Sequence, residues 1–362
     1  MVFPPDYATS RIRFREAAKR LGWVSYQQRI EGSGPNGEEL TIDSASSPNA
    51  LAKNVVIISS GLHGVEASFG SAVQLAVMEE WQQGIGLPSC VRCVFLHGLN
   101  PHGYAWERRV DADNIDPNRN FLLPGEAFAS SPIGYKSFDA LLNPPRPPAR
   151  WDFWTIRAWW SLMRFGLPAL KEAIVVGQHE FPKGLFFGGR GPGVTHQILH
   201  NCLGQWIGPA QAAIHLDFHT GLGRWGTYKL LLDNHPLTSD LQVQLDRWFG
   251  AGNYEEDDSK GVAYQPRGSF GPWCMSQNLA SNYLYLVAEF GTYGSVAMLG
   301  GLRAENQAYH WGNRDGVVER AARARLKELF CPTDPKWRAR VLEQGQELIR
   351  KAINAMAESE DG

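Results

Sequence analysis

Histidine and glutamate side chains follow an apolar segment of this sequence at a spacing that suits a metal ion. His63 and Glu66 stand three residues apart in Gly61-Leu62-His63-Gly64-Val65-Glu66, directly after the apolar run 54–60. A His and a Glu at this spacing, on a turn that enters a helix, can point at one ion. The pair is a weak signal by itself, because His and Glu also meet at this spacing by chance.

A second cluster, His215-Leu216-Asp217-Phe218-His219, lies in a strand-like segment. Alternation along a strand places His215, Asp217 and His219 on one face. His219 is at the carboxyl end, beside a glycine-rich turn, whereas His215 lies at the start and suits a core position or a supporting role. We expect Asp217 to support a ligand. Two histidines and one glutamate, with water in the fourth position, form the ligand set of a hydrolytic zinc site.

Two further groups suit hydrolysis. Arg109 and the pair Asn118-Arg119 lie in a loop segment, where a guanidinium fork can bind a carboxylate. Helix caps and surface ion pairs are the alternative interpretation of these residues. Glu289 ends the apolar run in Val287-Ala288-Glu289-Phe290-Gly291. Burial at the end of a strand makes a carboxylate a better base.

Alternating strands and helices are predicted to position these residues. Apolar runs predict strands at 54–60, 91–97, 212–218 and 282–290. Apolar residues at helical spacing predict a helix at 65–81, between the first two strands. The pattern predicts an α/β fold with a central mixed, largely parallel sheet flanked by helices. Ligands bind at the carboxyl ends of such strands.

No flexible linker or internal repeat divides the chain, so we expect a single domain over residues 1–362. Its core is predicted at about 50–312, with a large Pro- and Trp-rich insertion at about 122–209 and C-terminal helices at about 316–358. Many of the 13 tryptophans fall in or beside that insertion. We expect them to form an aromatic lid over the site.

Charge and composition exclude some classes of function. The 35 Lys and Arg residues against 37 Asp and Glu residues give a net charge of −2, so nucleic acid is not an expected partner. The apolar runs are too short to span a bilayer, and no secretory signal is visible, so we expect a cytoplasmic protein without a membrane partner. The five cysteines do not suggest a disulfide framework, and Cys90 and Cys93 read as structural.

Taken in order, these motifs resemble the zinc carboxypeptidase (M14-like) superfamily. That family shows His-x-x-Glu, an Asn-Pro…Arg…Asp-x-Asn-Arg-Asn-Phe block, a later His at a strand end and a final Glu on a strand. More narrowly, the first motif together with Gly184-Leu185-Phe186-Phe187-Gly188-Gly189 resembles a bacterial branch of carboxypeptidase-like proteins of DUF2817 type. The resemblance extends to the aspartoacylase and succinylglutamate desuccinylase deacylases.

The resemblance implies a role for each matching residue. His63, Glu66 and His219 match the ligands of one Zn²⁺ per chain. Glu289 matches the general base that takes a proton from the activated water, and Arg109 matches the arginine that polarises the scissile carbonyl. The residues that match substrate-binding positions are Asn118 and Arg119, which would hold a free carboxylate, and Tyr264, which would close over the substrate.

The substrate class stays open between two alternatives. A metallocarboxypeptidase-like hydrolase would cleave a small peptide at an amide bond next to a free carboxylate. Val65, where many carboxypeptidases have arginine, and the sequence Asp217-Phe218-His219-Thr220 favour an N-acyl amino-acid deacylase of the aspartoacylase type. A non-catalytic zinc-containing peptide-binding protein is a further alternative. The oligomeric state is not indicated.

Overall fold

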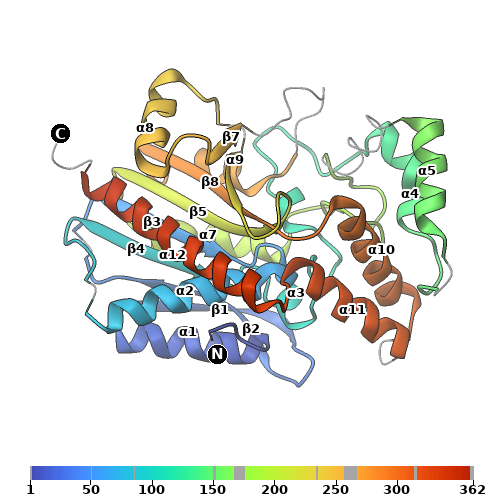
Figure 1. Ribbon diagram of the computed structural model, residues 1–362, viewed down its shortest axis with the longest axis horizontal. Coiled ribbons are helices and arrows are strands. Elements are labelled where there is room, and N and C mark those ends of the chain that lie inside the picture. Colours follow the sequence, from blue (N-terminus) through green and yellow to red (C-terminus); the bar gives the residue numbers. More distant parts are fainter. Residues whose placement is uncertain are drawn as a thin grey trace.

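One mixed sheet organises the computed structural model, which describes residues 2–49, 51–84, 86–149, 152–166, 176–233, 235–256, 267–313 and 316–358 (Figure 1). Within the described residues, the strand order is β1-β2-β4-β3-β5-β8-β6-β7. The strands are β1 Val24–Ser33, β2 Glu39–Ser46, β3 Asn54–Ser60, β4 Val91–His97, β5 Ala212–Gly221, β6 Tyr228–Leu232, β7 Tyr254–Glu256 and β8 Asn282–Gly291.

The centre of the sheet is parallel and its flanks are antiparallel. β3 pairs in parallel with β4 and with β5, and β5 pairs in parallel with β8. β1, β2 and β6 join by antiparallel pairing, and β7 then runs parallel to β6. Every residue of β3 and β4 is buried, which explains their continuous apolar sequence. The carboxyl ends of β3, β5 and β8 therefore lie side by side.

Helices cover both faces of the sheet. Side chains on one face, such as Val56 and Ile58, pack with α1 Tyr7–Arg20, α2 Ala67–Gln82, α8 Ser239–Phe249 and α12 Pro335–Glu358. The alternate side chains, such as Val55 and Ile57, pack with α7 Val194–Ile207 and α9 Phe270–Ser276. The period-two alternation of each strand thus supplies two separate cores.

A third apolar cluster joins helices beyond the sheet. It unites α4 Ile133–Leu142, α10 Ser295–Trp311 and α11 Val317–Phe330, and α5 Trp154–Phe165 touches it through Ala158. Val65, from the short helix η1 Gly64–Glu66, belongs to the same cluster. Figure 1 shows α4 and α5 together at one end of the molecule. The other short elements are α3 Pro101–Ala105 and η2 Pro117–Arg119.

The fold class predicted from the sequence is confirmed as a single α/β domain with a mixed sheet. The bounds predicted for β3 and β4 are those observed, whereas β1 and β2 extend the sheet to residues before 50. The insertion remains a prediction, and α7 within it packs directly on the sheet. Among the described residues, none of the helices has the length and apolar character needed to cross a bilayer.

Among the described residues, the tryptophans of the segment 122–209 do not gather into one aromatic lid. Trp206 is buried in the core beneath the sheet, whereas Trp159 and Trp160 are more than half exposed on α5. Trp151 lies outside the described residues. Closeness in sequence predicts that these indoles lie together. The structure separates them, because α7 packs under the sheet and α5 lies at one end of the molecule.

Candidate metal centre

A tight turn after β3 brings His63 and Glu66 together. Gly64 packs so closely on the next loop that a Cβ there would lie 2.1 Å from the carbonyl carbon of Gly103. Only glycine fits at this approach. The chain then enters η1, and both His63 and Glu66 are buried at the carboxyl end of β3.

His219 reaches the same place from β5, the strand next to β3. His63 Nδ1 lies 2.9 Å from Glu66 Oε1, and His219 Nδ1 lies 3.2 Å from Glu66 Oε2. One ligand atom from each of the three residues lies within 4.8 Å of the others. Because two imidazole nitrogens and a carboxylate converge, this is a donor set that suits zinc.

A carboxylate stands behind each histidine. His219 Nε2 lies 2.6 Å from Asp217 Oδ2, and His63 Nε2 lies 3.3 Å from Asp116 Oδ1. The hydrogen bond between His219 Nε2 and Asp217 fixes the tautomer and ring orientation of that histidine and leaves its Nδ1 as the ligand atom, whereas Asp116 lies within ion-pair distance of His63 Nε2. The prediction that Asp217 supports a ligand is consistent with this contact.

Opposite charges are concentrated in this buried cluster. Burial raises the pKa of Glu66, but His63 and His219 outweigh it and lower that pKa to about 2. Burial lowers the pKa of His219, but Asp217 and Glu66 hold it well above its usual range. The carboxylate of Glu66 is thus stable as an anion between two rings, and a cation can replace the proton shared among them.

A hydrogen-bonded chain extends from Asp217 into the core. Tyr285 Oη donates to Asp217 Oδ2 at 2.7 Å, and Ser59 Oγ donates to Asp217 Oδ1 at 2.5 Å. Ser59 Oγ also lies 2.7 Å from His215 Nε2, and His215 Nδ1 lies 2.8 Å from Tyr283 Oη. The core position predicted for His215 is confirmed, since it is fully buried.

Glu289 stands opposite His219 on the neighbouring strand, in the parallel register of β5 and β8. The backbone N–H of Leu222 donates to Glu289 Oε1 at 2.7 Å. Burial, and then the negative charge of Glu66, raise the pKa of Glu289 to about 7. A carboxyl group with this pKa can both take up and release a proton near neutral pH.

Arg109 lies against the same cluster. Its Nε is 2.9 Å from Asp116 Oδ2, and its Nη1 is 3.6 Å from Glu66 Oε1. Its guanidinium also stands 6.0 Å from the ring centre of Phe186. The guanidinium is therefore held beside the candidate metal ligands by a buried carboxylate.

Asn118 and Arg119 lie on η2, two and three residues after Asp116. Asn118 Oδ1 accepts a hydrogen bond from the backbone N–H of Phe270 at 2.9 Å, so a substrate carboxylate could be bound only through its NH₂ group. Arg119 Nη1 donates to the carbonyl of Asn118 at 2.6 Å. Tyr264 lies outside the described residues.

A family comparison matches this arrangement of motifs. The family described as "Protein of unknown function (DUF2817)" matches residues 3–344. The chain belongs to the DUF2817 family. The resemblance to that type predicted from the sequence is therefore confirmed. None of the curated proteins matches this DUF2817 protein.

Solved structures of other proteins are similar to this chain at low identity. Carboxypeptidase A from Helicoverpa armigera is 15% identical over 88% of this chain and 73% of its own, with a TM-score of 0.46. Bovine thrombin-activatable fibrinolysis inhibitor is 12% identical over 94% and 97%, with a TM-score of 0.44. Murein-tripeptide amidase from Escherichia coli O157 is 18% identical over 89% and 93%, with a TM-score of 0.36.

Sequence reasoning missed several residues of the site in this DUF2817 protein. Asp116 was grouped with the loop motif and not assigned to His63, although it precedes Asn118-Arg119 in the block that was recognised. Ser59 and Tyr285 gave no signal, because each lies inside an apolar strand and only strand register brings it to Asp217.

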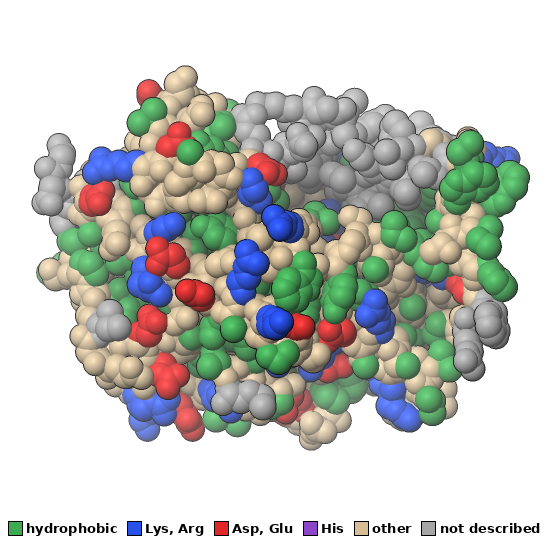
Figure 2. All heavy atoms as spheres, in the orientation of Figure 1, with side chains coloured by type: hydrophobic (Ala, Val, Ile, Leu, Met, Phe, Trp, Pro, Cys, Tyr) green, Lys and Arg blue, Asp and Glu red, His purple; other side chains and the backbone are tan. Residues whose placement is uncertain are grey.

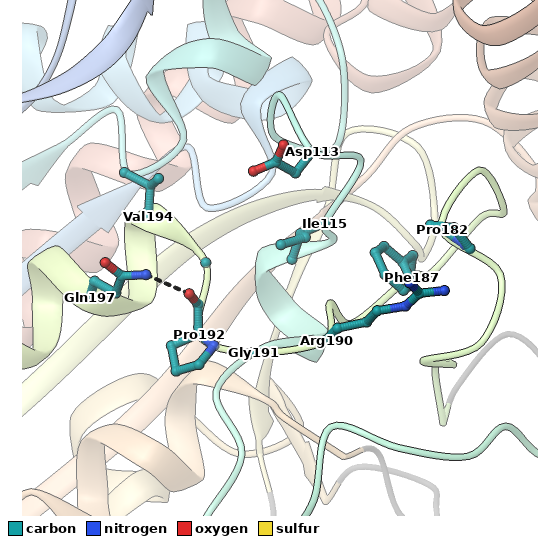
Figure 3. A pocket seen from close by; sticks show the side chains of 10 residues that line it. Asp113, Ile115, Pro182, Phe187, Arg190, Gly191, Pro192, Val194 and Gln197 are labelled. Atoms are coloured by element: carbon teal, nitrogen blue, oxygen red, sulfur yellow. Dashed lines mark hydrogen bonds between the residues drawn. The ribbon is translucent and has the colours of Figure 1, made fainter.

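A separate pocket of about 350 Å³ lies between the loop that carries Asp113 and Ile115 and the segment 190–194 (Figure 3). Ile115 and Phe187 line it, with Asp113 and Arg190 on different sides. Its described lining contains none of the residues of the metal centre, so the chemistry proposed below does not use it.

Proposed function

We propose that this DUF2817 protein is a zinc-dependent hydrolase that cleaves an amide bond next to a free carboxylate, in the manner of a metallocarboxypeptidase. One observation carries the proposal. The Nδ1 atoms of His63 and His219 face the two oxygens of Glu66, and Glu289 stands beside His219 in strand register. A ligand cluster and a carboxyl base at one sheet edge are what a metal-assisted hydrolysis needs.

The residues present fit one zinc ion per chain. The two imidazoles and the carboxylate are neutral and anionic donors of the kind that zinc prefers, and they supply three ligands, which leaves a fourth position for water. Asp116 and Asp217 complete the support of the histidines. When bound, zinc would polarise a carbonyl oxygen and lower the pKa of water.

Glu289 acts as the proton carrier in this proposal. Its carboxylate accepts a proton from the attacking water, and one of its oxygens is fixed by the N–H of Leu222. The amide C–N bond then breaks, and Glu289 passes the proton to the leaving nitrogen, so that an amide and water become a carboxylate and an amine. Its pKa of about 7 suits both steps.

The arginines align the substrate. Arg109, anchored on Asp116, stabilises negative charge that develops on the carbonyl oxygen. Asn118 and Arg119 hold the free carboxylate of the substrate, which turns binding energy into alignment. We assign closure over the substrate to Tyr264 on the strength of its motif.

A deacylase of N-acyl amino acids is the second candidate. Val65 packs into the apolar cluster with α4 and α11, at the position where many carboxypeptidases have an arginine that binds substrate. The loss of that contact suits a substrate shorter than a peptide. Both candidates use the same ligands and the same base, so only the substrate separates them.

Metal content and hydrolysis test the proposal together. Purified protein should contain about one zinc per chain, which His63→Ala should remove. Glu289→Gln should keep the zinc and lose at least about 100-fold of the hydrolytic rate. Glu79→Gln, at an exposed position of α2, is the matched control and should match the wild type.

The substrates for this test are peptides with a free C-terminus, the same peptides amidated, and N-acyl amino acids. Cleavage of the free peptides alone supports the carboxypeptidase, and cleavage of the N-acyl amino acids alone supports the deacylase. Full activity of Glu289→Gln would refute the assignment of the base. Bound zinc without hydrolysis of any of these substrates would refute the enzyme and favour a peptide-binding protein.

A further inference from the structure

The helix α5 presents an apolar face to solvent. Ile156, Trp159, Trp160 and Met163 follow the i, i+3, i+4, i+7 spacing of one helix face. Their exposed fractions are 56, 55, 66 and 68%, and Phe153 just before the helix is 61% exposed. Figure 2 shows apolar side chains gathered at this end of the molecule. A surface helix of a globular protein ordinarily turns such a face inward.

Packing on the opposite side fixes this orientation. Trp154 rests on α10, where a Cβ at Gly300 would lie 2.9 Å from the indole ring. Ala158 packs on the third apolar cluster, and Arg157 Nη2 donates to the carbonyl of Ala140 in α4 at 3.4 Å. These contacts fix the inner side of α5 against α4 and α10. The helix therefore cannot rotate to bury its outward face.

An open groove lies on the inner side of α5, where the helix meets α10 and α11. It has a volume of about 770 Å³ and runs between α5, α10 and α11. Trp154 and Gly300 belong to its lining, and Arg325 is the charged residue there. Val296, also in the lining, is 65% exposed. The groove is separate from the outward face, which Ile156, Trp159, Trp160 and Met163 form.

The charge around α5 is positive. Residues 144–166 carry four arginines and one aspartate. Arg146 and Arg157 share that aspartate, Asp152, at 2.7 and 3.4 Å, and both side chains stay about half exposed. Arg164 is exposed near the end of the helix. Two copies paired through this face would bring these arginines toward each other, whereas an anionic surface complements them.

We propose that α5 is an interfacial helix that docks this protein on an anionic lipid bilayer. Indole rings settle at the headgroup level, aliphatic side chains reach the acyl boundary, and arginines pair with lipid phosphates. The sequence predicted no membrane partner because no segment can span a bilayer. A helix that lies in the interface needs no such segment.

One apolar cluster links α5 to the turn that carries two of the candidate metal ligands. The apolar cluster that carries α4 and α5 includes Val65, which stands between His63 and Glu66. The helix that binds lipid and the turn that holds two metal ligands are therefore parts of one packed body.

Flotation with lipid vesicles tests this inference on the full chain. The wild type should float with phosphatidylcholine vesicles that contain about 30% phosphatidylglycerol and much less with phosphatidylcholine alone. The double variant Trp159→Ser, Trp160→Ser should bind about tenfold more weakly. Val243→Ser, at a position on α8 that is 69% exposed, is the control and should bind like the wild type.

Quenching of tryptophan fluorescence by brominated lipids checks the wild type without any substitution. Strong quenching with the anionic vesicles supports the insertion of the indoles. No flotation of the wild type, or equal flotation of the double variant, would overturn the inference. A dimer that depends on Trp159 and Trp160 and ignores vesicles would assign the face to a second copy. Zinc content and hydrolysis are separate readouts and decide only the proposed function.

Discussion

Asp217 offers the sharpest test of how the metal centre is held. Its carboxylate is fully buried and meets three groups, namely His219 Nε2 at 2.6 Å, Tyr285 Oη at 2.7 Å and Ser59 Oγ at 2.5 Å. Asp217→Asn keeps the shape but removes the charge behind His219. Its NH₂ group must face either the Ser59 hydroxyl, which then has to reverse its hydrogen bonds, or the two donors Tyr285 and His219.

The size of the effect follows from these contacts. Loss of a carboxylate behind a metal-binding histidine costs about 10- to 100-fold in metal affinity, or about 1.4 to 2.7 kcal/mol. The disturbed hydrogen bonds around residue 217 add about 1 to 3 kcal/mol of lost folding stability in the metal-free protein. Zinc affinity is measured by competition with a chromophoric chelator, and stability by urea unfolding of the metal-free form.

Asp43→Asn is the matched control. Asp43 is also a buried aspartate, but it pairs with Arg15 on α1, away from the metal centre. This control should lose stability and keep its zinc affinity. If Asp217→Asn binds zinc within about twofold of the wild type, the carboxylate does not support the ligand, and the reasoning from the His219 contact is refuted.

Two further perturbations probe the turn and the charge of the site loop. Gly64→Ala places a methyl group 2.1 Å from the Gly103 backbone, so the turn must shift, and we expect a loss of at least about 100-fold in hydrolysis. Gly86→Ala, where a Cβ meets nothing within 4 Å, should have no such effect, and equal activity of the two variants would contradict the close approach. Burial raises the pKa of Asp111 to about 7, so the folded state holds that proton more tightly and stability is lost as pH rises from about 4 to 7. Asp111→Asn keeps the oxygen that accepts from the N–H groups of Asp113 and Ile115 and should be more stable by up to about 4 kcal/mol at pH 8 and by little at pH 4. Urea unfolding of both proteins between pH 4 and 8 measures this difference in the free energy of unfolding. A difference that does not change with pH would contradict a buried charge at Asp111.

The elements predicted most accurately are those that have one continuous sequence pattern. β3 and β4 were bounded correctly because buried parallel strands are apolar throughout. No bounds were predicted for the helix α10, because Gly300 and Gly301 break its apolar pattern, although both lie inside one continuous helix and make room for Trp154 and Leu329. Glycines in a helix look like breaks until the neighbouring helix is known.

At the metal centre too, residues in a local motif could be predicted, and residues placed by tertiary contacts could not. His63, Glu66 and His219 could be chosen from spacing and from the family resemblance, and the structure brings them together. Asp116 and Tyr285 could not be assigned in this way, because their partners are set by strand register and by the return of a loop. Local motifs identify the ligands, whereas supporting groups depend on tertiary contacts.

The adjacency of β3, β5 and β8 has a consequence for the order of events in folding. The N–H of Thr220 reaches Glu66 across 154 residues of sequence, and Glu289 is further along the chain still. Closing such large loops is slow, and the ligands meet only after the sheet has formed. Zinc should therefore be captured by an already folded chain. Added metal would leave the refolding rate unchanged and would slow unfolding. The ion would thus stabilise the sheet after it has formed and would not help it to form.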